Sequence, residues 1–185
     1  RSRRLDILIN NAGVLSAGRF EDVALDVQRR MVDINVYGTM AGLHTAFPFL
    51  RNTPGSRVVN LCSASAIYGQ PELAVYSATK FGVRGLTEAL ELEWRRYGIR
   101  VIAMWPLFVA TAMVDGVETG STKSLGVHLS ADDVAAAIYQ ATHPDRRWPS
   151  RVHYPVGRQT KVLAALSQVS PNWAARLLNR ALSRS

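Results

Sequence analysis

The sequence predicts an α/β protein whose parallel sheet is covered by helices on both faces. Short apolar and β-branched runs, which are typical of buried strands, alternate along the chain with longer stretches of helical character. Parallel sheets are built from this alternation, because each strand needs a crossover connection to reach the next. A length of 185 residues with 48% hydrophobic residues also fits one soluble globular domain with a core of its own.

Four strands and four helices can be placed before the C-terminal tail. The strands are expected at residues 5–10, 57–62, 99–105 and 151–156. The helices are expected from about residue 25, at 35–50, at 73–97 and at 130–142. Gly98 ends the third helix, and the capping-box pattern Ser130-Ala-Asp-Asp133 begins the fourth. Residues 106–129 show no clear period, so no element is predicted there.

Positive charge is concentrated at the C-terminus. Residues 1–144 hold 14 Lys and Arg against 13 Asp and Glu, whereas residues 145–185 hold 8 against 1. We therefore divide the chain into a domain at 1–157 and a basic tail at 158–185, whose two short amphipathic helices are broken at Ser170-Pro171. The tail either packs on its own domain or another subunit, or makes peripheral contact with an anionic membrane. No nucleic-acid partner is predicted, because a binding motif and interleaved aromatic residues are missing.

Composition argues against several other classes of protein. The four histidines are scattered without ligand spacing, so no metal site is predicted. The longest nearly apolar stretch, residues 101–114, is too short to span a bilayer, which takes about 18 residues or more. The single Cys62 rules out an internal disulfide framework and suits a reducing compartment, so we expect a cytoplasmic protein.

Tyr76 and Lys80 form a candidate proton-transfer pair. They lie four residues apart in a predicted helix, so both side chains project from one face, one turn apart. An ammonium group beside a phenol favours the phenolate and lowers a pKa that is ordinarily about 10. An exposed helix pair with no chemical role is the alternative, and other motifs must decide between the two.

Two predicted strands end in residues suited to a binding site. Asn10-Asn11-Ala12-Gly13 closes the first strand, and Ser63 follows the second strand, thirteen residues before Tyr76. Ligands of open α/β sheets bind outside the carboxyl ends of the strands. Gly13, Ser63 and Pro106 all fall at such ends, so one pocket is expected to collect them.

In this order and spacing, the motifs resemble the short-chain dehydrogenase/reductase (SDR) family. The matching segments are Asn10-Asn11-Ala12-Gly13, Asn35 within residues 33–38, Ser63, and Tyr76 with Lys80. The resemblance implies a Rossmann-like, doubly wound parallel sheet. Because the sequence contains no glycine-rich phosphate loop, we expect only the C-terminal part of that fold, with about four strands and flanking helices. In such a truncated chain the first strand is left as an unpaired edge.

The resemblance also implies an activity, the interconversion of a carbonyl and an alcohol with NAD or NADP. Tyr76 would move the proton, while Lys80 would lower the Tyr76 pKa and bind the nicotinamide ribose. Ser63 would stabilise charge on the substrate oxygen, and its spacing from Tyr76 favours it over the neighbouring Ser65. Asn35 would order a water that leads to Lys80, with a helix cap as the plain alternative.

Further cofactor contacts are implied at the strand ends. The residues expected beside the cofactor are Asn11, Ala12, Gly13, Tyr76, Lys80, Pro106 and Thr111. Thr111 could instead be a solvated loop hydroxyl. Where the family usually has a glycine after the proline, this chain has Leu107, which is expected to reshape the turn and crowd the nicotinamide. The apolar loop that follows predicts a lipophilic small-molecule substrate, and the family often forms homo-oligomers.

Two competing interpretations stay open. The sugar-nucleotide epimerase/dehydratase branch shares the Tyr76 and Lys80 pattern, although the Asn-Asn-Ala-Gly motif and the short tail disfavour it. A fragment or pseudoenzyme without catalysis would act through partner or membrane binding of its basic tail. The missing phosphate loop and Leu107 favour this second interpretation, while Ser63, Tyr76 and Lys80 oppose it.

Overall fold

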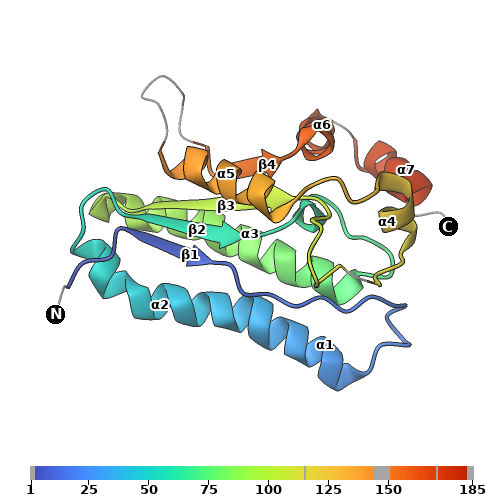
Figure 1. The fold of residues 1–185 in the computed structure, drawn as a ribbon, viewed down its shortest axis with the longest axis horizontal. Helices are drawn as coiled ribbons and strands as arrows, with labels where there is room; N and C mark the ends of the chain where they lie inside the picture. Colours follow the sequence, from blue (N-terminus) through green and yellow to red (C-terminus); the bar gives the residue numbers. More distant parts are fainter. Residues whose placement is uncertain (1–2, 115, 144–150, 170, 183–185) are drawn as a thin grey trace.

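A four-stranded parallel sheet forms the centre of the computed structural model, which describes residues 3–114, 116–143, 151–169 and 171–182 (Figure 1). The strands lie side by side in chain order, as β1 (Ile7–Asn10), β2 (Arg57–Leu61), β3 (Arg100–Pro106) and β4 (His153–Val156). All three pairings are parallel. The predicted fold class is confirmed, and each strand lies within two residues of its predicted bounds.

Strand β3 shows why the sheet needs helices on both faces. Its side chains alternate between two apolar layers, with Ala103 and Trp105 on one side and Ile102 and Met104 on the other. All of them are buried, as expected for a central parallel strand. β1 is one of the two edge strands, the other being β4, and Ile9 of β1 is 47% exposed. The expected unpaired edge is therefore present among the described residues.

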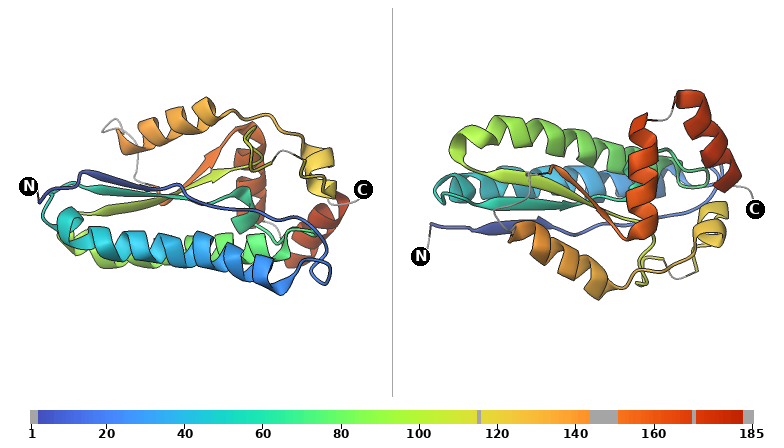
Figure 2. Two further views of the ribbon diagram at one scale, coloured as in Figure 1. Left: turned by 60° about the horizontal axis from the view of Figure 1, so that its bottom comes forward. Right: turned by 90° about the horizontal axis from the view of Figure 1, so that it is seen from above.

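Three helices cover one face of the sheet (Figure 2). They are α1 (Leu25–Val32), α2 (Gly38–Arg51) and α3 (Ala74–Trp94), which continues as a 3-10 turn to Tyr97. Gly98 ends this turn in the left-handed conformation with φ of 71°, as predicted. A π-helical segment, Asp33–Tyr37, joins α1 directly to α2. The sequence had predicted two separate helices here, whereas the structure has one continuous helical path.

The opposite face is covered by α5 (Ala131–Thr142), which begins with the predicted capping box. The Ser130 hydroxyl accepts from the Asp133 amide at 3.1 Å, and the Asp133 carboxylate accepts from the Ser130 amide at 2.8 Å. The sequence did not predict α4 (Gly120–Leu125). Its six residues are too few to show an apolar period, although Thr119 and Thr122 cap it reciprocally.

The tail forms the two expected helices, α6 (Arg158–Val169) and α7 (Asn172–Leu182). Helix α6 packs beside β4 and buries Leu163 and Ala164, while α7 lies beside α4 at the end of the molecule (Figure 2). Among the described residues, no helix has both the length and the apolar character needed to cross a bilayer.

Candidate active site

The carboxyl ends of β1, β2 and β3 meet at one edge of the sheet, because the strands are parallel and in register. Asn10 at the end of β1 pairs with Asn60, and Leu61 at the end of β2 pairs with Met104. The segments that begin at Asn11, Cys62 and Leu107 therefore leave the sheet side by side. This edge is where the sequence predicted the site.

Asn35 locks the segment after β1 to helix α3. Its side-chain oxygen accepts from the Val14 amide at 2.8 Å, and its nitrogen donates to the Val14 carbonyl at 2.9 Å. The same nitrogen donates to the Thr79 hydroxyl at 3.1 Å. Thr79 in turn donates to the Tyr76 carbonyl at 2.7 Å. Asn35 is not a helix cap, because it lies inside the continuous helical path with its side chain fully engaged across the site.

Lys80 projects from α3 towards the same edge. Its ammonium donates to the Leu61 carbonyl at 2.9 Å, and burial lowers the pKa of Lys80 below its ordinary value. A Cβ atom placed on Gly13 would lie 3.4 Å from the Asn35 oxygen and 3.8 Å from the Lys80 nitrogen. Because Gly13 has no side chain, its backbone lies close to both polar groups.

Tyr76 lies beside Ser63, with which its phenol interacts. Burial raises the pKa of Tyr76 to about 12, and the Ser63 hydroxyl opposes this shift only in part. The Lys80 ammonium is 5.5 Å from the centre of the Tyr76 ring and donates its hydrogen bond to the Leu61 carbonyl. The expectation that Lys80 lowers the Tyr76 pKa is therefore not met in this arrangement, since burial of the phenol dominates.

Ser63 and Ser65 have different partners. The Ser65 hydroxyl donates to the side-chain oxygen of Gln70 at 3.1 Å and accepts from Ser63 at 3.2 Å. The Ser65 amide donates to the Ser63 oxygen at 3.1 Å, which holds the turn that follows β2. Ser65 thus supports Ser63 from behind, while Ser63 faces the phenol of Tyr76.

An apolar loop covers Tyr76 from the other side. Leu107, Phe108 and Leu125 are buried in one cluster with the Tyr76 ring. The terminal methyl of Met113 would lie 3.8 Å from a Cβ on Gly13, so this side chain rests against the edge that carries Lys80. A bridge between Val109 and Leu129 closes the base of the loop. We call residues 107–114 and 116–129 the covering loop.

The other predicted contacts differ in exposure. Pro106 is the buried last residue of β3, whereas Asn11 and Ala12 are exposed on the segment after β1. Thr111 is also exposed, and its hydroxyl donates to the Val109 carbonyl at 3.4 Å rather than packing against Tyr76. Leu107 turns into the Tyr76 cluster without a left-handed backbone, because Glu72 is the one described non-glycine residue with positive φ.

Three residues that hold the site together, Thr79, Asn60 and Glu72, were not predicted from the sequence. Thr79 connects Asn35 to the Tyr76 backbone, and its place between Tyr76 and Lys80 was the available signal. Asn60 is a buried polar residue in an apolar strand; it accepts from Asn10 at 2.8 Å and donates to Thr87 at 2.9 Å.

Glu72, with φ of 62°, accepts from the Gly120 amide at 3.1 Å through its carboxylate. No local pattern marks that contact, which spans 48 residues.

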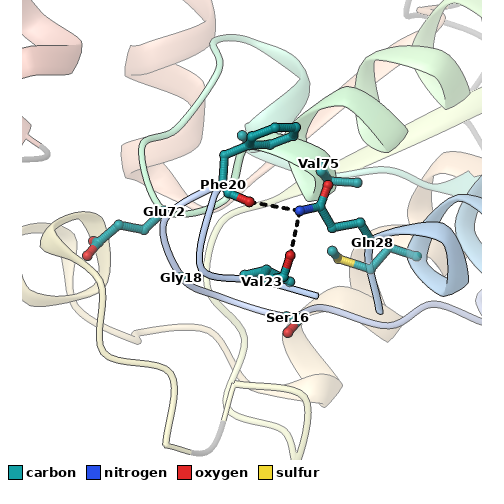
Figure 3. Close-up of a pocket in the computed structure, with 9 residues that line it drawn as sticks. Ser16, Gly18, Phe20, Val23, Gln28, Glu72 and Val75 are labelled. Atoms are coloured by element: carbon teal, nitrogen blue, oxygen red, sulfur yellow. Dashed lines mark hydrogen bonds between the residues drawn. The ribbon is translucent and has the colours of Figure 1, made fainter. Parts of the chain in front are cut away.

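A small pocket lies next to this site, at the start of α3 (Figure 3). Its lining includes Gly18, Met31, Glu72 and Val75. Gln28 holds the surrounding loop by donating to the carbonyls of Phe20 at 2.8 Å and Val23 at 2.7 Å. Figure 3 shows that both contacts come from one side-chain amide. The pocket adjoins the Tyr76 helix but does not contain Ser63 or Tyr76.

Within the described ranges, no three His, Cys, Asp or Glu side chains lie together in an arrangement that would hold a metal ion. The buried Cys62 thiol donates to the Lys80 carbonyl at 3.1 Å, and burial raises its pKa to about 11. Cys62 therefore stays protonated at neutral pH and serves to pack β2 against α3.

Comparison with known proteins places the chain in a family. The model of the short chain dehydrogenase family matches residues 1–122. An uncharacterized oxidoreductase of Staphylococcus epidermidis is 32% identical over 139 residues, which are 75% of this chain and 60% of that protein. A trans-4-hydroxycyclohexanecarboxylate dehydrogenase of Sinomonas cyclohexanicum is 36% identical over 116 residues, which are 63% of this chain and 44% of that protein.

Solved structures show the same architecture. A short chain dehydrogenase from Burkholderia cenocepacia in complex with NADP has a TM-score of 0.83 at 21% identity, covering 98% of this chain and 72% of that one. A 3-ketoacyl-(acyl-carrier-protein) reductase from Brucella melitensis complexed with NADH has a TM-score of 0.73 at 28% identity, covering 83% and 66%. At 21% identity the first match speaks for the fold alone.

The chain thus spans between 44% and 60% of the lengths of these two curated relatives. The family match covers well over half of the chain, and includes the segments that carry Asn35, Ser63, Tyr76 and Lys80. Together with the parallel sheet and the juxtaposed Ser63 and Tyr76, this match shows that the chain belongs to the short-chain dehydrogenase/reductase family.

Proposed function

We propose that the protein is an NAD(P)-dependent oxidoreductase that interconverts a carbonyl and an alcohol. The observation that carries the proposal is the position of the Tyr76 phenol against Ser63, one helical turn from the buried Lys80. A phenol and a second hydroxyl that face one another suit a reacting oxygen, since one group transfers the proton and the other stabilises developing charge.

The roles of the side chains follow from their surroundings. Tyr76 carries a proton at neutral pH and can therefore act as the general acid in carbonyl reduction, although burial, which raises its pKa to about 12, makes the enclosed phenol a weaker acid than a free one. Ser63 donates to the same substrate oxygen. Asn35 is a positioning residue that holds the segment after β1. The proposal includes an ordered water between Asn35 and Lys80, which would use the second lone pair of the Asn35 oxygen because its amide nitrogen already donates to Val14 and Thr79.

The residues at the sheet edge fit a nicotinamide cofactor, which would supply or accept the hydride. Gly13 leaves its backbone open beside the Lys80 ammonium, and Lys80 can donate to ribose hydroxyls. The proposed contacts are Asn11, Ala12, Gly13, Tyr76, Lys80, Pro106 and Thr111. The related structures named above contain NADP in one case and NADH in the other, and both cofactors stay within the proposal. Met113 rests against Gly13, so the covering loop must shift for a ring to bind there.

A lipophilic small molecule is the proposed substrate. The covering loop presents Leu107, Phe108 and Leu125 to Tyr76, and none of these side chains offers a polar group. A 3-alpha-(or 20-beta)-hydroxysteroid dehydrogenase of Mycobacterium tuberculosis is 37% identical over 113 residues of this chain. Its name, with that of the cyclohexanecarboxylate enzyme, indicates ring alcohols as the class to test first.

Self-association and a cytoplasmic location also belong to the proposal. Helices α2 and α3 expose Met40, Phe49 and Phe81 at between 41% and 46%, and apolar groups on adjacent helices suit contact with a second copy. The free thiol of Cys62 is compatible with a reducing compartment.

A non-catalytic family member is the second candidate. The observation in its favour is the enclosure of Tyr76, which is 8% exposed beneath Leu107 and Phe108. A protein of this kind would keep the fold and bind partners through its tail. Cofactor binding distinguishes the two candidates, because only an oxidoreductase needs the covering loop to open.

Tyr76→Phe is the direct test. The full chain is assayed for oxidation of NADH and NADPH with a panel of cyclic ketones, and cofactor binding is followed by fluorescence. We expect Tyr76→Phe to lower kcat by about 1,000-fold while cofactor affinity and the melting temperature stay within error. Tyr139→Phe, at an exposed tyrosine, is the matched control. Turnover unaffected by Tyr76→Phe would refute the assignment, and a chain that binds neither cofactor would favour the non-catalytic candidate.

A further inference from the structure

We propose that the outward face of the two tail helices is a docking surface for an anionic lipid bilayer. On α7 this face consists of Trp173, Arg176, Leu177 and Arg180, which are spaced i, i+3, i+4 and i+7 and so share one side of the helix. Trp173 is 67% exposed and Leu177 is 58% exposed, with both arginines exposed beside them. Large apolar groups flanked by arginines suit the boundary between lipid headgroups and acyl chains.

The other side of α7 is already occupied by the domain. The Asn179 side-chain nitrogen donates to the Gly69 carbonyl at 2.6 Å, and α7 packs along α4. These contacts fix which side of the helix faces outwards. Trp173 and Leu177 are therefore exposed although α7 already packs against α4 of the same chain.

Helix α6 repeats the arrangement. Its inner side buries Thr160, Leu163 and Ala164 against the domain. Its outer side exposes Val162 at 57% and Leu166 at 43%, with Arg158 and Lys161 also exposed. We call the outward residues of α6 and α7 together the tail face.

Charge complementarity identifies an anionic surface as the occupant. Residues 146–185 contain eight Lys and Arg and no Asp or Glu, whereas residues 1–144 are nearly balanced. Each basic residue near an anionic leaflet contributes attraction, and the apolar groups add burial in the interface. A nucleic acid would use the charges but would leave Val162, Leu166 and Leu177 against a polar backbone.

A second copy of the chain fits the tail face less well. In a two-fold contact the same patch meets itself, so the arginines of one copy would face those of the other. The tail sequence supplies no carboxylate side chain that could separate them. Like charges brought together in this way oppose association.

Helix α7, which carries part of the tail face on its outward side, lies close to the candidate active site. Gly69, which accepts from α7, lies between Ser63 and Tyr76 in the sequence, and α4 belongs to the covering loop. A docked tail would present this loop to a lipophilic substrate dissolved in the bilayer. This last step rests on the proposed function, whereas binding to vesicles does not, so the two can fail separately.

Vesicle binding by the full chain is the test. The protein is sedimented with vesicles of phosphatidylcholine alone and of phosphatidylcholine with phosphatidylglycerol, at low and high salt. We expect binding to the anionic vesicles only, weakened by salt, and a blue shift of tryptophan fluorescence that Trp173→Phe removes. Combined Arg176→Gln and Arg180→Gln changes should weaken binding by about thirty-fold, given the usual attraction of a basic residue to an anionic leaflet.

Leu177→Glu and Leu92→Glu form a matched pair, because Leu92 is 68% exposed on α3, away from the tail. Only Leu177→Glu should reduce vesicle binding. The proposal is overturned if the protein does not sediment with anionic vesicles, or if neutral vesicles bind equally. It is also overturned if the two variants behave alike, or if Leu177→Glu instead abolishes a dimer seen without lipid.

Discussion

Two chemically different sets of residues surround Tyr76, one polar and one apolar. On one side Asn35, Val14 and Thr79 form a network of buried and partly buried hydrogen bonds, each of which joins groups far apart in the sequence or lies within one helix turn. On the other side the covering loop touches the ring through apolar side chains, and one of its polar contacts is that of the Gly120 amide to the Glu72 carboxylate. Separating paired polar groups costs more free energy than shifting apolar side chains against one another. We therefore expect the first side to be rigid and the covering loop to be more mobile.

Removing Asn35 from the polar network should have the largest effect on the stability of the fold. Asn35→Ala leaves the Val14 amide and carbonyl, two partly buried groups, without their partner, so we expect the free energy of unfolding to fall by about 3 kcal/mol. Urea denaturation measures this loss. Asn52→Ala, at an exposed turn residue, should change stability by less than about 0.5 kcal/mol. A loss at Asn35 no larger than that at Asn52 would show that the network does not hold the site.

Truncating an apolar side chain of the covering loop should lower the free energy of unfolding by less, and the effect should stay within the loop. Leu125→Ala removes a 9% exposed side chain from the Tyr76 cluster, and we expect a loss of about 2 kcal/mol because the loop can partly collapse into the space. Hydrogen exchange of the covering loop should speed up, while exchange at Val14 keeps its protection. Faster exchange at both places would mean that the two sides are one cooperative unit.

Glu72 connects the sides, and two substitutions separate its roles. Glu72→Gly removes the carboxylate that accepts from Gly120 but relieves the φ of 62°, whereas Glu72→Ala removes the carboxylate and keeps the unfavourable backbone. We expect the Gly variant to be more stable than the Ala variant by about 1 kcal/mol. Both should speed amide exchange in α4. Equal stability of the two variants would mean that the backbone at Glu72 is not strained.

A pH titration at the far edge of the sheet should give the smallest effect. His153 on β4 stacks on Trp105, contacts Glu88 at 2.7 Å and lies near Arg84. Burial lowers the pKa of His153, with partial opposition from Glu88, so the unfolded chain holds this proton more readily. Stability should therefore fall as pH drops below the ordinary histidine pKa of about 6.5.

His153→Gln should flatten that dependence, measured by urea denaturation at several pH values between about 5 and 8. His44→Gln, at an exposed histidine on α2, is the matched control for the substitution itself. A slope unchanged in His153→Gln would assign the pH dependence to other groups.

The elements and the main site residues could be predicted because their signals are local. Apolar runs marked the strands, Gly98 and the Ser130 capping box marked helix ends, and four-residue spacing placed Tyr76 and Lys80 on one face of α3. The joining of α1 to α2 was missed because a π-helical segment has no distinct periodicity. The Glu72 contact was missed because it joins residues that only the folded chain brings together.

The sequence by itself determined the parallel α/β fold, the family and the residues that gather at one edge of the sheet, since strand periodicity and motif spacing are properties of the chain. Only the tertiary structure decided how those residues behave. Burial raises the Tyr76 pKa to about 12, because the desolvation of an ionised phenol outweighs its interaction with the Ser63 hydroxyl, while the Lys80 ammonium donates to the Leu61 carbonyl instead. The covering loop, whose sequence shows no period, supplies much of that burial.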